Sequence, residues 1–209
     1  MKAFIFDVDG TLWDSTDKVA ISWQMACRER GIPCDHITGD RLKREFGKLL
    51  PDIGYSIFPD LPKEEALRLT EICCDVENEY LLTNGPAPYA GVPELFAELS
   101  KKMPLFIVSN CQAGYIEAFL ASTGLGSFVT DHLCPGDTGN AKADNIKEII
   151  RRHHLTDVAY VGDTAGDAAS AKEAGIPFIF AAYGFGSVAN AAATIDSPLD
   201  LLRLADAKL

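Results

Sequence analysis

Two features that would place this chain in common protein classes are missing from its sequence. No apolar run approaches the ~20 residues that a membrane-spanning helix needs. Basic residues are not in excess, since 19 of them face 30 acidic residues and give a formal net charge of −11. This balance disfavours binding to nucleic acid or to an anionic membrane surface. We therefore expect neither as a partner.

Two further absences concern the compartment. The apolar run at residues 3–6 is too short for the core of a signal peptide, and acids follow it at once. No two cysteines have CxxC spacing, so a zinc ribbon or a redox motif is not indicated. We expect a cytoplasmic protein whose six cysteines are reduced thiols that mostly fill space in the interior.

Short apolar runs alternate with helical patterns over most of the 209 residues. Residues 3–6, 105–108, 158–161 and 178–181 are typical of buried parallel strands, and a fifth strand near 128–130 is expected. Helices are predicted at 92–102, 114–122, 143–153 and 167–174. This alternation predicts an α/β fold with a doubly wound parallel sheet of the Rossmann-like type.

Residues 15–84 interrupt the alternation directly after the first strand. They include helical patterns, one of them at 18–30, and no convincing strand, and they end in the turn-rich joint 84–88. We expect a small all-α cap at 15–84, inserted into an α/β core domain formed by 1–14 and 85–209. The densest run of cations lies in this cap, at Arg41, Lys43, Arg44 and Lys48. It is either a solvated helix face or a contact for a substrate anion.

Asp7 and Asp9 follow the first predicted strand and precede a Gly-Thr turn. Two acids at the end of a buried strand need a compensating charge, such as a metal ion and a lysine. The chemistry that suits such a pair is nucleophilic attack by one carboxylate and proton transfer by the other. An Asx turn is the structural alternative.

Polar side chains also follow two later strands, where the carboxyl ends of a doubly wound sheet bind ligands. They are Ser109, Asn110, Asp163 and Asp167. Ser109 and Asn110 can alternatively cap the helix that starts after residue 113, and Asp167 can cap its own helix. Lys142 begins the predicted helix between these strands. It is preferred over Lys147 as the compensating cation, because Lys147 would lie further along that helix.

In this order the residues resemble the four motifs of the haloacid dehalogenase-like hydrolase superfamily, in its phosphoglycolate phosphatase-like and β-phosphoglucomutase-like branch with a helical cap. The motifs are Asp7-x-Asp9-Gly10-Thr11, Ser109-Asn110, Lys142 and Gly162-Asp163-Thr164-x-x-Asp167. The resemblance covers nearly the whole chain. It implies a Mg²⁺-dependent phosphatase that hydrolyses a small phosphomonoester metabolite through an aspartyl-phosphate.

The resemblance also implies a role for each motif residue. Asp7 is the nucleophile, and Asp9 is the general acid and then the general base. Mg²⁺ is held by the Asp7 carboxylate, the Asp9 backbone carbonyl and Asp163. Lys142 neutralises charge on the phosphoryl group and on Asp7, and Asp167 orients Lys142 or a water on the metal. The phosphate-binding groups are Ser109, Asn110 and Thr11.

Other reactions stay open from the sequence. A β-phosphoglucomutase typically has adjacent acids in the fourth motif, whereas Asp163 is followed by Thr164. A phosphonatase would need a cap lysine for a Schiff base, for which Lys43 or Lys48 is a weak candidate. A phospho-switch of the response-regulator kind would have no helical insert. The sequence indicates neither the substrate nor the oligomeric state.

Overall fold

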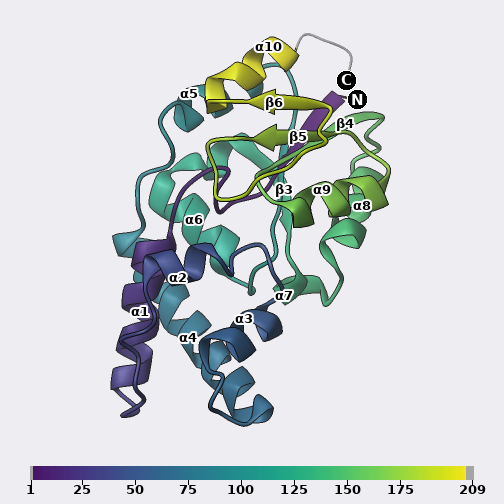
Figure 1. The fold of residues 1–209 in the computed structure, drawn as a ribbon. Coiled ribbons are helices and arrows are strands. Elements are labelled where there is room, and N and C mark those ends of the chain that lie inside the picture. The colour runs from purple at the N-terminus through teal and green to yellow at the C-terminus, as the bar shows by residue number, and fades with distance from the viewer. Residues whose placement is uncertain (1, 206–209) are drawn as a thin grey trace.

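The computed structural model describes residues 2–205 and contains a sheet of six parallel strands in the order β3-β2-β1-β4-β5-β6 (Figure 1). The strands are β1 (Lys2–Phe6), β2 (Leu105–Val108), β3 (Val129–Leu133), β4 (Asp157–Gly162), β5 (Phe178–Ala181) and β6 (Ala193–Ile195). The strand order runs outward in both directions from the β1–β4 pair, so the predicted doubly wound α/β fold is confirmed.

Helices cover both faces of the sheet. Phe4 and Phe6 of β1 pack into a core with α5 (Val92–Leu99), α6 (Tyr115–Thr123) and α10 (Leu201–Ala205). Ala3 and Ile5 face the opposite side, where α8 (Lys142–Arg152) and α9 (Ala165–Ala174) lie. Burial of both faces explains why β1 is a continuous apolar run. Three one-turn helices complete this part: η1 (Leu125–Phe128), α7 (Pro135–Thr138) and η2 (Pro198–Asp200).

Four helices fill the chain between β1 and α5. They are α1 (Thr16–Arg28), α2 (Gly39–Lys43), α3 (Leu50–Ile57) and α4 (Lys63–Asn84). Figure 1 shows them gathered below the sheet, with α4 packed against α1 and α3. The Trp23 ring stacks on Phe58, with centroids 6.1 Å apart. No helix within residues 2–205 combines the length and apolar character that a membrane span requires. The domain boundaries at 14/15 and 84/85 stay a prediction.

Several sequence-based bounds need correction. The fifth strand, expected at 128–130, is β3 and continues to Leu133. β6 was not predicted, because three residues are too few to display a pattern. The helix expected at 92–102 ends at Leu99, and the one expected at 167–174 begins at Ala165. Ser109 and Asn110 do not cap α6, whose N-cap is Gly114.

All six cysteines are unpaired and buried, which agrees with their predicted role as interior filling. Burial raises the pKa of the Cys74 and Cys111 thiols well above the ordinary value, so both stay protonated.

Candidate active site

A tight turn after β1 brings the carboxyl ends of β1 and β4 together. Three consecutive N–H groups, those of residues 11–13, donate to the Val8 carbonyl at 2.7–3.3 Å. Gly10 has a φ of +76°, and a Cβ at this position would lie 2.1 Å from Oδ2 of Asp163. Only glycine satisfies both the left-handed backbone and this close approach. The Gly-Thr turn noted in the sequence is therefore what lets Asp163 lie beside the β1 loop.

Lys142 forms a buried ion triad with two of the predicted acids. Its Nζ lies 3.0 Å from Oδ1 of Asp7 and 2.7 Å from Oδ1 of Asp167, and all three side chains are buried. Burial disfavours the charge on Lys142, but the Asp167 and Asp7 carboxylates outweigh it and raise the lysine pKa. Lys147 instead pairs at the surface with Asp144, 3.0 Å away. The structure thus places Lys142, and not Lys147, among the acids.

Asp163 completes a cluster of three carboxylates. The Phe185 N–H donates to its Oδ2 at 2.7 Å, while its Oδ1 is buried and has no partner among residues 2–205. Ligand atoms of Asp7, Asp163 and Asp167 all lie within 4.8 Å of one another. Burial, followed by repulsion from Asp7 and Asp167, raises the pKa of Asp163 to about 8.

The three acids are not equally free to bind a cation. Lys142 donates to Oδ1 of Asp167, and the Thr164 hydroxyl and N–H donate to Oδ2 at 2.7 and 2.9 Å. The latter bonds belong to the capping box of α9, so the expected capping role of Asp167 is confirmed. Asp7 and Asp163 are therefore the carboxylates with capacity left for a cation.

Asp9 is held by two hydroxyl groups that sequence reasoning missed. Ser15 donates to its Oδ1 at 2.6 Å, and the Tyr115 hydroxyl lies 2.8 and 2.7 Å from its two oxygens. Burial raises the pKa of Asp9 to about 7, although these hydrogen bonds oppose the shift. A carboxyl group with this pKa can give and take a proton near neutral pH. Tyr115 stands on α6, 106 residues along the chain, and no motif marks it.

The predicted phosphate-binding residues differ in their surroundings. A hydrogen bond from the Ser109 side chain to Asp7 lowers the pKa of that carboxyl, although burial and Asp167 raise it overall to about 6. Asn110 donates from Nδ2 to the Gly47 carbonyl at 3.0 Å, which ties the core to the loop between α2 and α3. Thr11 is buried beneath the turn and does not line the cavity at Asp7. Its phosphate-binding role stays a prediction.

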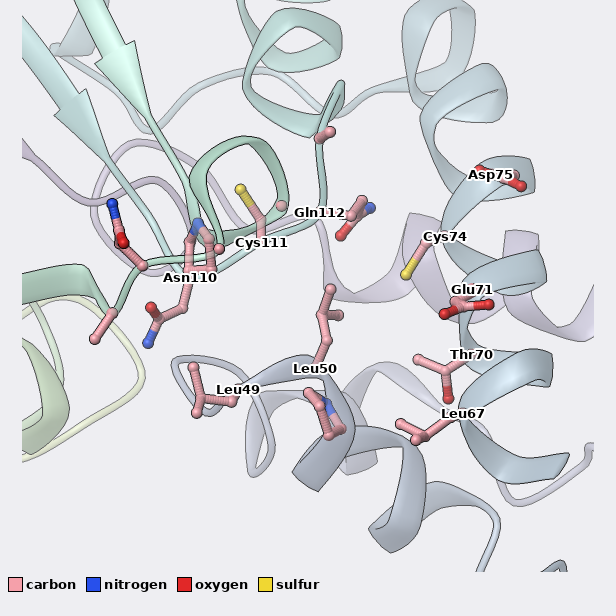
Figure 2. A pocket seen from close by; sticks show the side chains of 17 residues that line it. Leu49, Leu50, Leu67, Thr70, Glu71, Cys74, Asp75, Asn110, Cys111 and Gln112 are labelled. Carbon is pink, nitrogen blue, oxygen red and sulfur yellow. The ribbon is translucent and has the colours of Figure 1, made fainter. Parts of the chain in front are cut away.

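Two adjoining cavities lie at this site, and Asp7 and Asp9 line the inner one. The inner one, of about 30 Å³, lies between the carboxylates and the helices α1, α3 and α4. The outer one, of about 680 Å³, lies between α3, α4 and the loops after β2 and β3 (Figure 2). Both are lined by Leu50, Asn110, Cys111 and Gln112. The two cavities are therefore neighbours that share part of one wall.

Glu77 of α4 is a second group that the sequence did not reveal. It is only 4% exposed, it lines the inner cavity, and its two oxygens accept from Gln112 and from the Trp23 indole. Burial raises its pKa to about 7. The sequence of α4 is typical of an amphipathic helix, and this pattern does not indicate that Glu77 faces the core.

Three cations of the run at residues 41–48 form ion pairs with acids outside the Asp7–Asp163–Asp167 cluster. Arg41 and Lys48 pair with the buried Glu45 at 3.2 and 2.6 Å, and Lys43 pairs with Asp14 at 2.8 Å. No Lys, Arg or His of the described chain lines either cavity. In this arrangement neither Lys43 nor Lys48 is placed to form the Schiff base of a phosphonatase.

Comparison with known proteins agrees with this geometry. A family model described as haloacid dehalogenase-like hydrolase matches residues 4–181. An N-acetylmuramic acid 6-phosphate phosphatase of Pseudomonas putida is 26% identical over 100% of this chain and 98% of its own length. A phosphoglycolate phosphatase of Aquifex aeolicus is 25% identical over 99% of this chain and 97% of its own length.

Similarity also extends to solved structures. A haloacid dehalogenase-like family hydrolase from Streptococcus pneumoniae superposes with a TM-score of 0.82, over 97% of both chains and with 22% identity. This match supports the fold, including the helical block after β1. A response-regulator fold, which lacks such an insert, is therefore not the fold of this chain.

Proposed function

The chain belongs to the haloacid dehalogenase-like hydrolase family and is one of its phosphatases, and we propose that it hydrolyses the phosphomonoester of a small metabolite through an aspartyl-phosphate on Asp7. The observation that carries this proposal is the buried Asp7–Lys142–Asp167 triad beside the unpartnered Oδ1 of Asp163. It supplies a nucleophile, a fixed cation and a free metal ligand within one small space.

The residues present fit Mg²⁺. Asp7 and Asp163 provide hard carboxylate oxygens, and the buried Oδ1 of Asp163 lacks a hydrogen-bond donor, which a cation would replace. We propose these two carboxylates and the Asp9 backbone carbonyl as ligands, with Asp167 holding Lys142 in place. The ion would screen the charge of the phosphoryl group against an anionic nucleophile.

The remaining groups account for proton and charge transfer. A carboxylate oxygen of Asp7 attacks phosphorus, the bond to the ester oxygen breaks, and Asp9 gives its proton to the departing alkoxide. Asp9 then takes a proton from a water molecule whose oxygen attacks phosphorus, which frees Asp7 and releases inorganic phosphate. Lys142 Nζ and Ser109 stabilise the negative charge that develops on the phosphoryl oxygens. Ser15 and Tyr115 hold the Asp9 carboxyl for both transfers.

The cap supplies the surroundings of the leaving group in this proposal. Helices α3 and α4 form the wall of both cavities, and the Asn110–Gly47 bond closes the cap loop onto the core. We propose residues 15–84 as a cap domain on a core of 1–14 and 85–209. A cytoplasmic enzyme without a nucleic acid or membrane partner is the accompanying expectation.

Phosphate release from a panel of small phosphomonoesters tests the function. The panel contains sugar phosphates, phosphoglycolate, nucleotide monophosphates and p-nitrophenyl phosphate, each assayed with Mg²⁺ and with excess chelator. We expect release that falls at least about 100-fold on chelation, because three clustered carboxylates repel a phosphoryl group without the ion. Equal release in chelator contradicts the metal requirement, and no release from any ester contradicts the phosphatase.

Replacing Asp9 with asparagine is expected to separate the two chemical steps. The amide of the variant cannot donate or accept the proton, so turnover of alkyl esters falls at least about 100-fold. An aryl ester with a good leaving group still phosphorylates Asp7, and the phosphoryl adduct accumulates because water is no longer activated. Intact mass spectrometry after mixing with p-nitrophenyl phosphate detects this adduct. Normal steady-state rates in D9N would assign the acid–base role to another group.

A further inference from the structure

The space beyond the catalytic carboxylates is large enough for more than a two-carbon leaving group. The outer cavity of about 680 Å³ is within the range of pockets that enclose a small organic ligand. The inner cavity, of about 30 Å³, holds little more than one water molecule. The larger space next to Asp7 is therefore the outer cavity, which begins at Asn110 and Gln112 of the shared wall.

Acidic side chains line both cavities, and Lys142, which contacts Asp7, lies outside their lining. Within residues 2–205, the inner wall carries Asp7, Asp9 and Glu77, the outer wall carries Glu71 and Asp75, and no Lys, Arg or His lines either. A carboxylate on the leaving group would enter this space without a counter-charge. The cap cations do not compensate, because they pair with Glu45 and Asp14.

Glu77 is the buried acid that α4 contributes to the inner cavity. Its two hydrogen-bond donors, the Trp23 indole and the Gln112 amide, are both neutral. They orient the carboxylate without cancelling its charge. Each oxygen keeps a lone pair for a further donor, and a hydroxyl group can provide one.

Asn110 independently indicates that the ligand carries a hydrogen-bond donor. Its Nδ2 donates to the Gly47 carbonyl, which fixes the amide orientation and leaves Oδ1 as an acceptor. This Oδ1 is buried and has no partner in the described part of the chain. A buried acceptor without a donor is rare in folded proteins and is expected to find one in the bound ligand.

We propose that the substrate is the phosphate ester of an uncharged sugar or polyol, and that Glu77 selects against leaving groups that carry a carboxylate. The proposal rests on the phosphatase function above and adds the substrate class. Hydroxyl groups of the leaving group donate to Glu77 and to Oδ1 of Asn110. The two curated relatives described above are named for substrates that contain a carboxylate, so this chain would differ from them in specificity.

Two matched pairs of esters test the class. 2-Hydroxyethyl phosphate differs from 2-phosphoglycolate, and glucitol 6-phosphate from 6-phosphogluconate, by a hydroxymethyl group in place of a carboxylate. At about pH 8, above the Glu77 pKa of about 7, we expect kcat/KM to favour the hydroxyl member at least about tenfold in each pair. The six-carbon esters are expected to exceed the two-carbon esters.

Glu77→Gln tests whether Glu77 selects against a carboxylate on the leaving group. This change removes the charge and retains an amide oxygen, so the hydroxyl-to-carboxylate ratio is expected to fall at least about fivefold. Both esters are assayed on one preparation, and the ratio therefore does not depend on the folded fraction. Glu79→Gln removes the same charge from an exposed site on α4 and is expected to leave the ratio unchanged.

The outcomes separate the two proposals. Equal or faster hydrolysis of the carboxylate esters overturns the substrate class while the phosphatase stands. A ratio that Glu77→Gln does not change overturns the role of Glu77. No phosphate from any ester, p-nitrophenyl phosphate included, overturns the phosphatase and this inference together.

Discussion

Asp7→Asn is expected to reduce phosphate release at least about 10³-fold without destabilising the protein. The amide nitrogen that replaces one carboxylate oxygen is not a nucleophile toward phosphorus, and no other side chain at the end of β1 can take its place. Asp9 is turned toward Ser15 and Tyr115, and Asp163 is held by the Phe185 N–H. The covalent step is therefore lost and not merely slowed by poorer positioning.

The stability part of this prediction follows from the pKa of Asp7. Burial, and then the Asp167 carboxylate, raise this pKa from 3.8 to about 6. A carboxyl group whose pKa rises on folding favours the fold in its protonated form, so the ionised Asp7 opposes folding above about pH 6 when no metal is bound. Asparagine is neutral, and Lys142 keeps Asp167 as a partner. In chelator at neutral pH, the Tm of D7N is expected to equal or exceed that of the wild type.

Initial rates of phosphate release and thermal unfolding in chelator check both parts. Asp157→Asn is the matched control, because Asp157 is the first residue of β4 and lies at the amino end of the strand, away from the carboxyl ends where Asp7 lies. We expect D157N to retain activity. Retained activity in D7N would remove Asp7 as the nucleophile, and lost activity together with a lower Tm would indicate that Asp7 is mainly structural.

The sequence was most informative where a local motif and the sheet topology act together. Parallel strands end at one edge, so residues that directly follow β1, β2 and β4 must converge. Asp7, Ser109 and Asp163 are expected close to one another for this reason. In the folded chain Ser109 forms a hydrogen bond with Asp7, and ligand atoms of Asp7 and Asp163 lie within 4.8 Å of each other. The same reasoning favours Lys142 over Lys147, because the first residue of α8 lies at that edge.

Two groups that reach the site from helices were not found in this way, one at the start of α6 and one in the middle of α4. Tyr115 contacts Asp9 from α6, and Glu77 lines the inner cavity from the 22-residue helix α4. Helical periodicity separates buried from exposed faces, but it does not say which buried polar residue faces a ligand. The direction of Glu77 depends on how α4 packs against α1 and the core, which is a property of the tertiary structure.

For the cationic run at residues 41–48, the sequence left two interpretations open. Arg41, Lys43 and Lys48 belong to the densest positive run of the sequence, which predicted either a solvated helix face or a contact for a substrate anion. In the folded chain they neutralise acids of the protein itself, Glu45 above all, which is only 3% exposed. Arg41 and Glu45 are four residues apart, a spacing that brings side chains together on a helix. This one pair could therefore have been predicted from the sequence.

Lys142→Met is expected to lower both activity and stability strongly. The change keeps the apolar stem of the side chain but removes the only cation bonded to Asp7 and Asp167 within residues 2–205. Three carboxylates within 4.8 Å of one another would then be buried without a counter-charge. Loss of one partner from a buried ion pair destabilises a protein by about 3–5 kcal/mol. Phosphate release is expected to fall at least about 100-fold, since developing charge on the phosphoryl group also loses its cation.

Urea unfolding in chelator, compared with Lys147→Met and with a double variant, checks the origin of this loss. Lys147 lies at the surface of α8 and pairs with Asp144 and Glu173, so K147M is expected to change the unfolding free energy by less than about 1 kcal/mol. Asp7→Asn in the K142M background removes one of the repelling charges and is expected to restore about 1–2 kcal/mol.

The double variant distinguishes two causes of the loss in K142M. If it is no more stable than K142M, the loss comes from contacts of the lysine with Tyr160, whose ring centroid lies 5.6 Å from Nζ. Recovery instead assigns the loss to uncompensated charge, because only the number of buried carboxylates differs between the two variants. Uncompensated negative charge is also the property through which these carboxylates would attract a metal ion.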